Sequence, residues 1–297
     1  MSKFKQTSIS DIILDIVIYT SLFILTFSII IPILHIFSVS LSDSEAVLGL
    51  KVGIWPVGFT IESYSKIFTT KLIPNAFKNS VIYTLVGTVI NLSLTALTAY
   101  PLSKKELTLR KLYMTLIIIT MYIGGGLIPM LLLIRGLGLF DTMWSLILPG
   151  AIATGNLLML RSFFQTIPAE LEESAKIDGA NDFLIFISIV IPTSKAALAT
   201  IGLFYAVGHW NSFMGAIIYL QSFEKMPLQV ILREIVIKGT RLDALAYQDP
   251  LESMKSEAWS TRMKYATLFV SMIPMMMVYP FVQKYFVKGV MIGSLKG

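Results

Sequence analysis

The sequence predicts an all-α, polytopic membrane protein built as a bundle of six transmembrane helices. Hydrophobic residues make up 55% of the 297 residues and charged residues 14%, whereas soluble domains carry about 25% charged residues. The mean hydropathy is +0.74. Apolar spans of roughly 20 residues, long enough to cross a hydrocarbon core of ~30 Å, lie at about 12–41, 79–103, 112–134, 142–163, 195–220 and 264–286.

Composition also excludes several classes of site. The chain has no cysteine, which rules out disulfides and thiolate metal ligands. Its net charge of +6 comes from dispersed basic residues that flank apolar spans, a pattern typical of membrane anchoring and not of nucleic-acid binding. The first span follows Lys3 and Lys5 as a signal peptide would, but its apolar run is too long and no small-residue cleavage site follows. We therefore expect a retained helix.

The short loop at 104–111 predicts the orientation, because four of its eight residues are basic and such loops stay cytoplasmic. The N-terminus, the loop 164–194 and the C-terminus are then expected inside the cell. The loops 42–78, 135–141 and 221–263 are expected outside. The last of these is also rich in Lys and Arg, but long loops are weaker evidence for orientation.

In the second span, polar residues recur at helical spacing: Thr88, Asn91, Thr95 and Thr98. Such a stripe faces other helices or water. Hydrogen bonding between helices is the commoner use, and lining of a translocation pathway is the alternative. In the third span, Gly124-Gly125-Gly126 predicts a bend or a close backbone approach, because glycines weaken a helix. The small residues from Pro149 to Gly155 in the fourth predict tight helix contact.

The fifth span contains Trp210, Asn211 and Ser212 in an otherwise apolar run. Polar side chains at membrane depth usually face the bundle interior, and a ring beside an amide suits a sugar. An interfacial aromatic belt explains the tryptophan equally well. Further on, apolar residues spaced between Pro227 and Gly239 predict a short amphipathic helix.

The loop 164–194 predicts a helix, a sharp turn and a second helix. Pro168 suits a first helical turn, and the acidic residues that follow suit a helix N-terminus. Lys176 stands four residues after Glu172, so the two are expected to pair. Gly179 is expected to end the first helix by adopting positive φ.

The second helix of this loop is expected to begin at a capping side chain, either Asn181 or Asp182. Pro192 is expected to break or kink it. Loops between membrane helices need only a few residues, so this longer one is interpreted as a contact site.

The loop resembles the cytoplasmic coupling loop of ABC importer permeases. Their pattern is E-A-A, three residues, G, nine residues, I, two residues and P, and this chain has Glu173, Ala175, Gly179, Ile189 and Pro192 in register, with Ser174 in place of the second alanine. The chain is similar to permeases of the carbohydrate class, such as the shorter permease of maltose-type importers. Within that class it is most like the branch for complex oligosaccharides, lipo-oligosaccharides and alginate. Residues 124–129, 137–139, 210–213 and the tail carry this weaker likeness.

The resemblance implies a type I ABC importer fold and a permease in a bacterial plasma (inner) membrane that moves a carbohydrate by alternating access. It implies an N-terminal helix and outer loop at 1–75, a permease core at 76–286 and a cytoplasmic tail at 287–297. It also implies partners: a second permease in a heterodimer, two ATPase subunits that bind ATP and Mg, and an extracellular solute-binding protein. No catalytic residue, metal or cofactor is expected in this chain.

The same resemblance implies site residues. Those expected to contact the ATPase are Glu173, Ser174, Ala175, Asp178, Gly179, Ile189 and Pro192, with Lys296 and Gly297 of the tail nearby. Those expected along the substrate pathway are Asn91, Thr95, Trp210, Asn211 and Ser212, although in such systems the partner permease often makes most substrate contacts.

Three alternatives remain at this level. An ABC permease for a non-sugar solute shares the coupling loop. An ion-coupled transporter needs an ionisable relay at membrane depth, whereas the middle spans lack Asp and Glu and no internal repeat is visible. A membrane enzyme needs convergent polar groups, and the only histidines, His35 and His209, have no partners at ligand spacing. The chain also lacks a G-x-x-x-x-G-K-[ST] phosphate loop.

Overall fold

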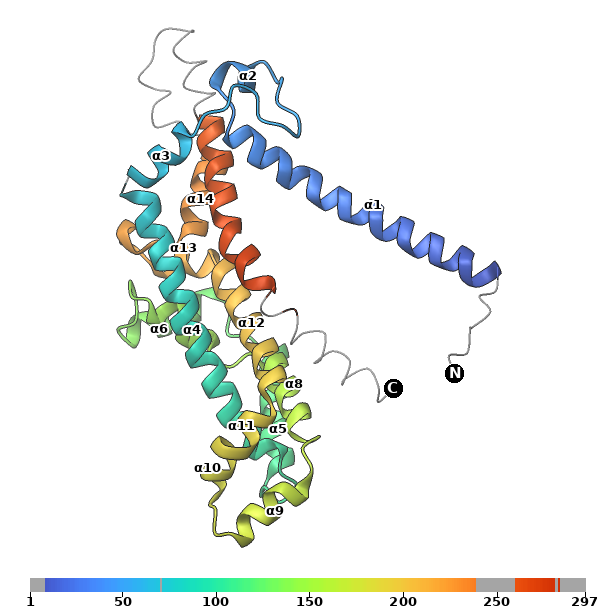
Figure 1. The fold of residues 1–297 in the computed structure, drawn as a ribbon. Coiled ribbons are helices and arrows are strands. Elements are labelled where there is room, and N and C mark those ends of the chain that lie inside the picture. Colours follow the sequence, from blue (N-terminus) through green and yellow to red (C-terminus); the bar gives the residue numbers. More distant parts are fainter. Residues whose placement is uncertain (1–8, 70, 239–259, 281–282, 284–297) are drawn as a thin grey trace. The chain divides into compact units, whose positions relative to one another are not determined.

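A computed structural model describes residues 9–69, 71–238, 260–280 and 283 (Figure 1). All regular elements in these ranges are helices, as the sequence predicts. The chain forms two compact units, residues 1–70 with 234–271 and residues 71–233 with 272–297. Each unit is described by itself.

The first unit contains α1 (Ile9–Ser40), α2 (Ser44–Leu48), α3 (Glu62–Thr69) and the helical residues 260–271. Apolar side chains along most of α1 are exposed, as expected of a helix that faces lipid. Beyond α1, the buried Arg262 donates to Ser44 Oγ at 2.9 Å and lies 3.5 Å from the Glu62 carboxylate. These polar contacts tie the start of helix 260–271 to α2 and α3.

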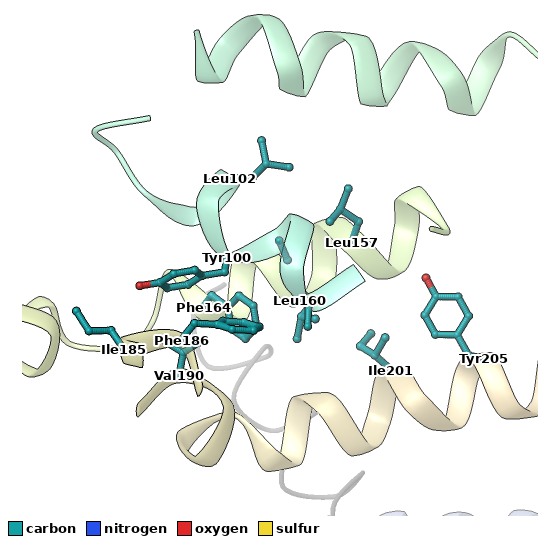
Figure 2. Packing of buried hydrophobic residues seen from close by; sticks show 12 residues of the cluster. Tyr100, Leu102, Leu157, Leu160, Phe164, Ile185, Phe186, Val190, Ile201 and Tyr205 are labelled. Carbon is teal, nitrogen blue, oxygen red and sulfur yellow. The ribbon is translucent and has the colours of Figure 1, made fainter. Parts of the chain in front are cut away.

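The second unit is built on α4 (Leu72–Ser103), against which α12 (Lys195–Asn211) and α8 (Thr154–Phe164) pack. Their shared core is apolar and contains several aromatic rings (Figure 2). Its buried members are Ala96, Ala99, Tyr100, Leu102, Leu157, Leu160, Phe164, Ile185, Phe186, Val190, Ile201 and Tyr205. Because Ile185, Phe186 and Val190 belong to the predicted cytoplasmic loop, that loop is continuous with the core of the bundle.

Two of the predicted spans are bent or broken, and a third bend joins the predicted loop 164–194 to the fifth span. The helices α5 (Arg110–Tyr122) and α6 (Leu127–Gly136) meet at 115°, around the three glycines. The pair α7 with η1 (Trp144–Gly150) meets α8 at 54°, and residues Asp182–Thr193 meet α12 at 83°. In the described part of the chain, two helices are long and apolar enough to cross a membrane, or up to five if each bent pair counts as one span. The protein is therefore polytopic, and helical residues 260–280 cover most of the sixth predicted span, 264–286.

The fifth span differs from its prediction as one helix over 195–220. The helix α12 ends at Asn211, Ser212 is extended with φ −71° and ψ 125°, and a separate helix α13 spans Met214–Tyr219. Asn and Ser are weak helix formers whose side chains compete for backbone hydrogen bonds, which explains a break at this pair. The segment η3 (Phe223–Lys225) and the helix α14 (Leu228–Lys238) follow, so the helix predicted between Pro227 and Gly239 is confirmed.

Close packing of α4 on α12 depends on Gly87. A Cβ atom at this position would lie 2.5 Å from His209 Nε2, and the same nitrogen is 3.0 Å from Asn91 Nδ2. We expect Gly87→Ala to displace the ring, break this hydrogen bond and destabilise the protein by about 1–3 kcal/mol, as overpacking does. Thermal unfolding in detergent measures the change.

The control is Gly208→Ala, one residue from His209, where a Cβ would have no heavy atom within 4 Å. It should be neutral or stabilising, because alanine is the better helix former. Equal destabilisation by the two variants would show that contact with His209 is not the cause.

Candidate functional site

The turn at Gly179 is a hydrogen-bonded C-terminal cap of a helix. The helix α9 spans Ala169–Ile177 and is followed by Asp178 and then by Gly179, whose φ is +83°. Gly179 N donates to Lys176 O at 3.0 Å, and Ala180 N donates to Ala175 O at 2.9 Å. These two bonds are the Schellman pattern, which satisfies the last carbonyl groups of a helix and needs a residue that tolerates positive φ. The predicted helix stop at Gly179 is confirmed.

The second helix starts at once, because Asn181 Oδ1 accepts from Leu184 N at 2.8 Å. Of the two predicted caps, Asn181 is therefore the one used. The chain continues as α10 (Asp182–Ile185), a π-helical turn over Phe186–Val190 and α11 (Ile191–Thr193). Pro192 lies inside α11, and the 83° bend falls two residues later, at Ser194. The turn before the proline, where its missing N–H removes a helical hydrogen bond, is the π-helical one. Pro168 lies at the N-cap of α9, just before the first turn where it was predicted.

Five of the predicted coupling residues lie at the end of α9 and its turn, whereas Ile189 and Pro192 lie further along the second helical segment. Glu173, Ser174, Asp178 and Gly179 are exposed, as is Pro192, whereas Ala175 and Ile189 are half-buried. Sequence reasoning missed the exposed apolar side chains beside them. Ile177 is 87% exposed and Phe183 64%, and Leu171, Leu184 and Ile187 are also exposed. A charged and apolar surface of this kind is typical of a protein contact.

Two contacts hold the coupling loop (residues 164–194) on the end of α4. The Lys104 ammonium forms an ion pair with Glu172 of α9 and lies 4.4 Å from the centre of the Tyr100 ring. That ring packs on Phe186, with centroids 5.2 Å apart. Both helices of the loop are therefore attached to one turn of α4.

The predicted pair of Lys176 with Glu172 is wrong. Lys176 lies 3.2 Å from Asp182 across the turn, and both side chains are exposed. Glu172 instead bonds Lys104, which local sequence spacing cannot reveal because 68 residues separate the two.

Two of the four residues in the predicted polar stripe of α4 contact α12, whereas Thr98 donates to Leu94 O of its own helix. Asn91 and Thr95 are buried, and they lie opposite His209 and Tyr205, at 3.0 Å and 2.7 Å respectively. The Tyr205 hydroxyl also accepts from Ala153 N at 2.9 Å. These bonds join α4, α12 and the start of α8.

The three candidates at the end of α12 are placed differently. Trp210 is 3% exposed and meets the Phe77 ring edge-on, with centroids 5.8 Å apart. Asn211 and Ser212 are exposed, and Asn211 Nδ2 donates to Val207 O at 3.0 Å. The polar groups of this segment are thus presented at the helix break, beside a buried tryptophan.

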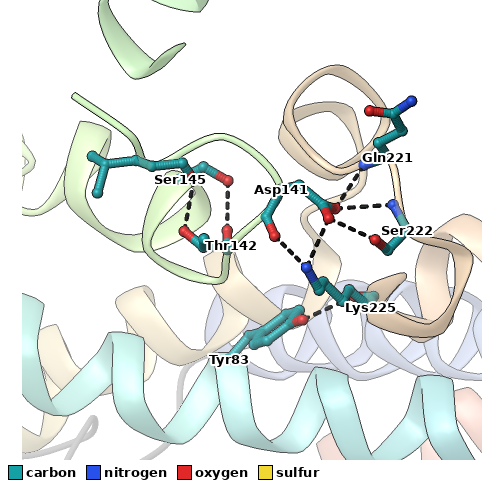
Figure 3. A network of polar contacts seen from close by, with 8 residues as sticks. Tyr83, Asp141, Thr142, Ser145, Gln221, Ser222 and Lys225 are labelled. Atoms are coloured by element: carbon teal, nitrogen blue, oxygen red, sulfur yellow. Dashed lines mark hydrogen bonds and ion pairs between the residues drawn. The ribbon is translucent and has the colours of Figure 1, made fainter. Parts of the chain in front are cut away.

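Sequence reasoning also missed a polar cluster around Asp141, in the loop between α6 and α7 (Figure 3). One carboxylate oxygen accepts from the backbone N–H groups of Gln221 and Ser222, both at 2.9 Å. The other accepts from Ser222 Oγ at 2.6 Å and from Lys225 Nζ at 2.7 Å. The Tyr83 hydroxyl donates to Lys225 O at 2.9 Å, so the cluster joins this loop and segment 220–226 to α4.

These hydrogen bonds make the stability of the folded protein depend on pH. Those from Lys225 and then Ser222 lower the pKa of Asp141 well below its usual range. A depressed carboxylate pKa adds stability that is complete above the unfolded pKa of about 3.9 and is lost as the pH falls below it. We expect Asp141→Asn to lower the melting temperature at pH 7 and to show a shallower further loss below about pH 5 than the wild type.

Thermal unfolding followed by tryptophan fluorescence between pH 7 and pH 3.5 checks this expectation. Asp182→Asn is the control, because its ion pair is exposed on both sides and such pairs contribute little. Parallel pH profiles for the wild type and Asp141→Asn would contradict the assignment.

The remaining candidates do not add to this site. Lys296 and Gly297 lie outside the described residues. Within residues 9–69, 71–238, 260–280 and 283, no group of three or more His, Cys, Asp or Glu could hold a metal ion.

Comparisons with known proteins agree on one family. Residues 91–292 match the family described as "Binding-protein-dependent transport system inner membrane component". The chain is 42% identical to the polygalacturonan/rhamnogalacturonan transport system permease protein YtcP of Bacillus subtilis, over 95% of this chain and 98% of that protein. It is 40% identical to the protein LplC of the same organism, over 90% of each.

A solved structure is also similar. It is described as a bacterial ABC transporter involved in the import of the acidic polysaccharide alginate. The TM-score is 0.86 at 34% sequence identity, and the match covers 96% of this chain and all of the compared chain.

Proposed function

The chain belongs to the family of binding-protein-dependent transport system inner membrane components, and on that premise we propose that its importer carries oligosaccharides or polysaccharide fragments. As a member, it is a multi-pass inner-membrane permease of an ABC importer, which works with an ATPase and a binding protein. The carbohydrate proposal rests chiefly on the 42% identity, over nearly the whole chain, to a permease named for polygalacturonan and rhamnogalacturonan.

A panel of solutes tests the proposal. The whole importer is reconstituted in nanodiscs with its binding protein, and ATP hydrolysis is measured with oligosaccharides, amino acids, peptides and polyamines. We expect stimulation by an oligosaccharide alone. Stimulation by one of the other solutes would establish the alternative of a non-sugar permease.

We further propose six membrane spans, with the N-terminus, the coupling loop and the C-terminus in the cytoplasm. The two long helices and three bent pairs, together with helical residues 260–280, support this number. The basic loop 104–111 supports the orientation. The division at 1–75, 76–286 and 287–297 and the heterodimer with a second permease are proposed on the family resemblance.

The coupling loop is proposed to dock on an ATPase subunit. The turn at Gly179 is exposed and is rimmed by Glu173, Asp178 and Ile177. Its attachment to Tyr100 and Lys104 would pass a displacement of the loop into α4. Lys296 and Gly297 of the tail are proposed to lie near the same partner.

The substrate pathway is proposed to pass the break between α12 and α13. Asn211 and Ser212 would present polar groups there, and the buried Trp210 would hold this segment in place by packing. Asn91 and Thr95 would hold α12 in place through their hydrogen bonds to His209 and Tyr205. A polar break suits a pathway, because backbone that leaves a helix at membrane depth is tolerated only in protein or along a water-filled cavity.

Single cysteines test this placement cleanly, since the chain has none. We expect a membrane-impermeant thiol reagent to label positions 211 and 212, and bound oligosaccharide to block the labelling. Position 210 should react more slowly, because Trp210 is buried. Absence of labelling at 211 and 212 in both inward- and outward-facing states would rule out the pathway and leave solute recognition to the partner permease.

A further inference from the structure

An arginine lies over an aromatic ring next to the break in the fifth span. The guanidinium carbon of Arg233, on α14, is 5.7 Å from the centre of the Phe213 ring. The ring is half-buried against a small apolar cluster of Tyr83, Ala216, Leu220 and Val230, which holds it in place. Arg233 is exposed. A guanidinium that stacks on a ring is pre-oriented, and its planar fork suits a carboxylate.

Phe213 directly follows the exposed Asn211 and Ser212. The exposed hydroxyl and amide therefore stand one and two residues, respectively, before the ring on which the guanidinium lies. An amide and a hydroxyl exchange hydrogen bonds with sugar hydroxyls, and a guanidinium binds a carboxylate through two parallel hydrogen bonds. Neutral sugars offer the guanidinium only hydroxyl acceptors and not the charged pair of oxygens that its fork fits best.

We propose that Arg233, held on Phe213, binds the carboxylate of a uronate unit in an acidic oligosaccharide. This inference rests on the proposed carbohydrate import and adds that the sugar is acidic. A guanidinium also binds the phosphate of a lipid headgroup. The amide and hydroxyl beside the ring favour the sugar, and the experiment below separates the two.

The test uses calorimetric titration of trigalacturonate and its full methyl ester into the assembled importer in nanodiscs, without binding protein. The ester lacks the three charges and carries three small methyl groups in their place. Wild type should bind the acid more tightly than the ester. Arg233→Gln should weaken binding of the acid at least about tenfold, the order expected for a lost charged hydrogen bond, and change binding of the ester less than twofold. Arg233→Lys should lie between, because lysine keeps the charge but lacks the fork.

Arg135→Gln is the matched control. Arg135 is also exposed and lies 4.5 Å from the centre of the Phe140 ring, but it is not beside the α12–α13 break in sequence. It should bind both ligands as the wild type does.

Several results would overturn the inference. The wild type could bind acid and ester with equal affinity, or bind neither. Arg233→Gln could lose affinity for both ligands equally, or Arg135→Gln could show the same loss of affinity as Arg233→Gln. A defect that vanishes in nanodiscs without anionic lipid would assign Arg233 to headgroups. The solute panel above is a separate assay, so oligosaccharide stimulation there would preserve the proposed function even if this inference fails.

Discussion

Gly179→Val is expected to abolish the substrate-stimulated ATP hydrolysis of the assembled importer while the protein still inserts and assembles. A Cβ at position 179 would meet no heavy atom within 4 Å, but φ there is +83°. The harm is therefore conformational: a left-handed conformation costs an ordinary residue about 1–2 kcal/mol, and β-branched residues fit it poorly. Valine would open the Schellman turn and redirect the exposed surface of the coupling loop.

Gly138→Val is the matched control. Gly138 has φ +70°, and a Cβ added there would likewise meet no heavy atom within 4 Å, so the substitution imposes a similar strain in the loop after α6. Its thermal destabilisation should resemble that of Gly179→Val, but stimulation by substrate should persist. If Gly179→Val transports normally, the turn has no part in coupling.

Reversing the charge of Lys104 should reduce coupled ATP hydrolysis several-fold. The ion pair of Lys104 with Glu172 is mostly buried, with side chains 26% and 14% exposed. Placing two carboxylates there should cost about 1–3 kcal/mol, between the values for exposed and buried pairs, and release α9 from α4. The double exchange, Lys104→Glu with Glu172→Lys, should recover most of the activity.

The double-mutant comparison isolates the pair from other effects of each substitution. Lys176→Glu is the control for stability alone: its thermal unfolding should match that of the wild type, because the exposed pair of Lys176 with Asp182 should contribute little. ATP hydrolysis by the reconstituted importer, with loaded and unloaded binding protein, is the measurement. Failure of the double exchange to recover activity would show that the contact does not transmit force.

Much of the coupling loop follows from local sequence. Gly179 needs positive φ and Asn181 offers a capping oxygen, so these two boundaries are set by their own residues. The bend at Gly124-Gly125-Gly126 is equally local. Such features are predictable because their energies depend on residues within one or two helical turns.

Contacts between distant segments were not predictable in the same way. Glu172 has a lysine four residues away, but it bonds one 68 residues away, because the α9 helix lies against the end of α4. Asp141 gave no signal in the sequence, and its role comes from segment 220–226, some 80 residues further along the chain. The break at Ser212 was hidden by apolar residues on both sides that extend the hydropathy pattern across it.

Uptake of a labelled oligosaccharide into proteoliposomes tests the central claim most directly. The full importer, the importer without this chain, the importer without its ATPase subunits, and this chain alone are compared, each with loaded binding protein and ATP. We predict uptake only by the full importer and no ATP hydrolysis above background by the chain alone. ATP hydrolysis by the pure chain, or ATP-driven uptake without it, would contradict its assignment as the membrane component of the pump.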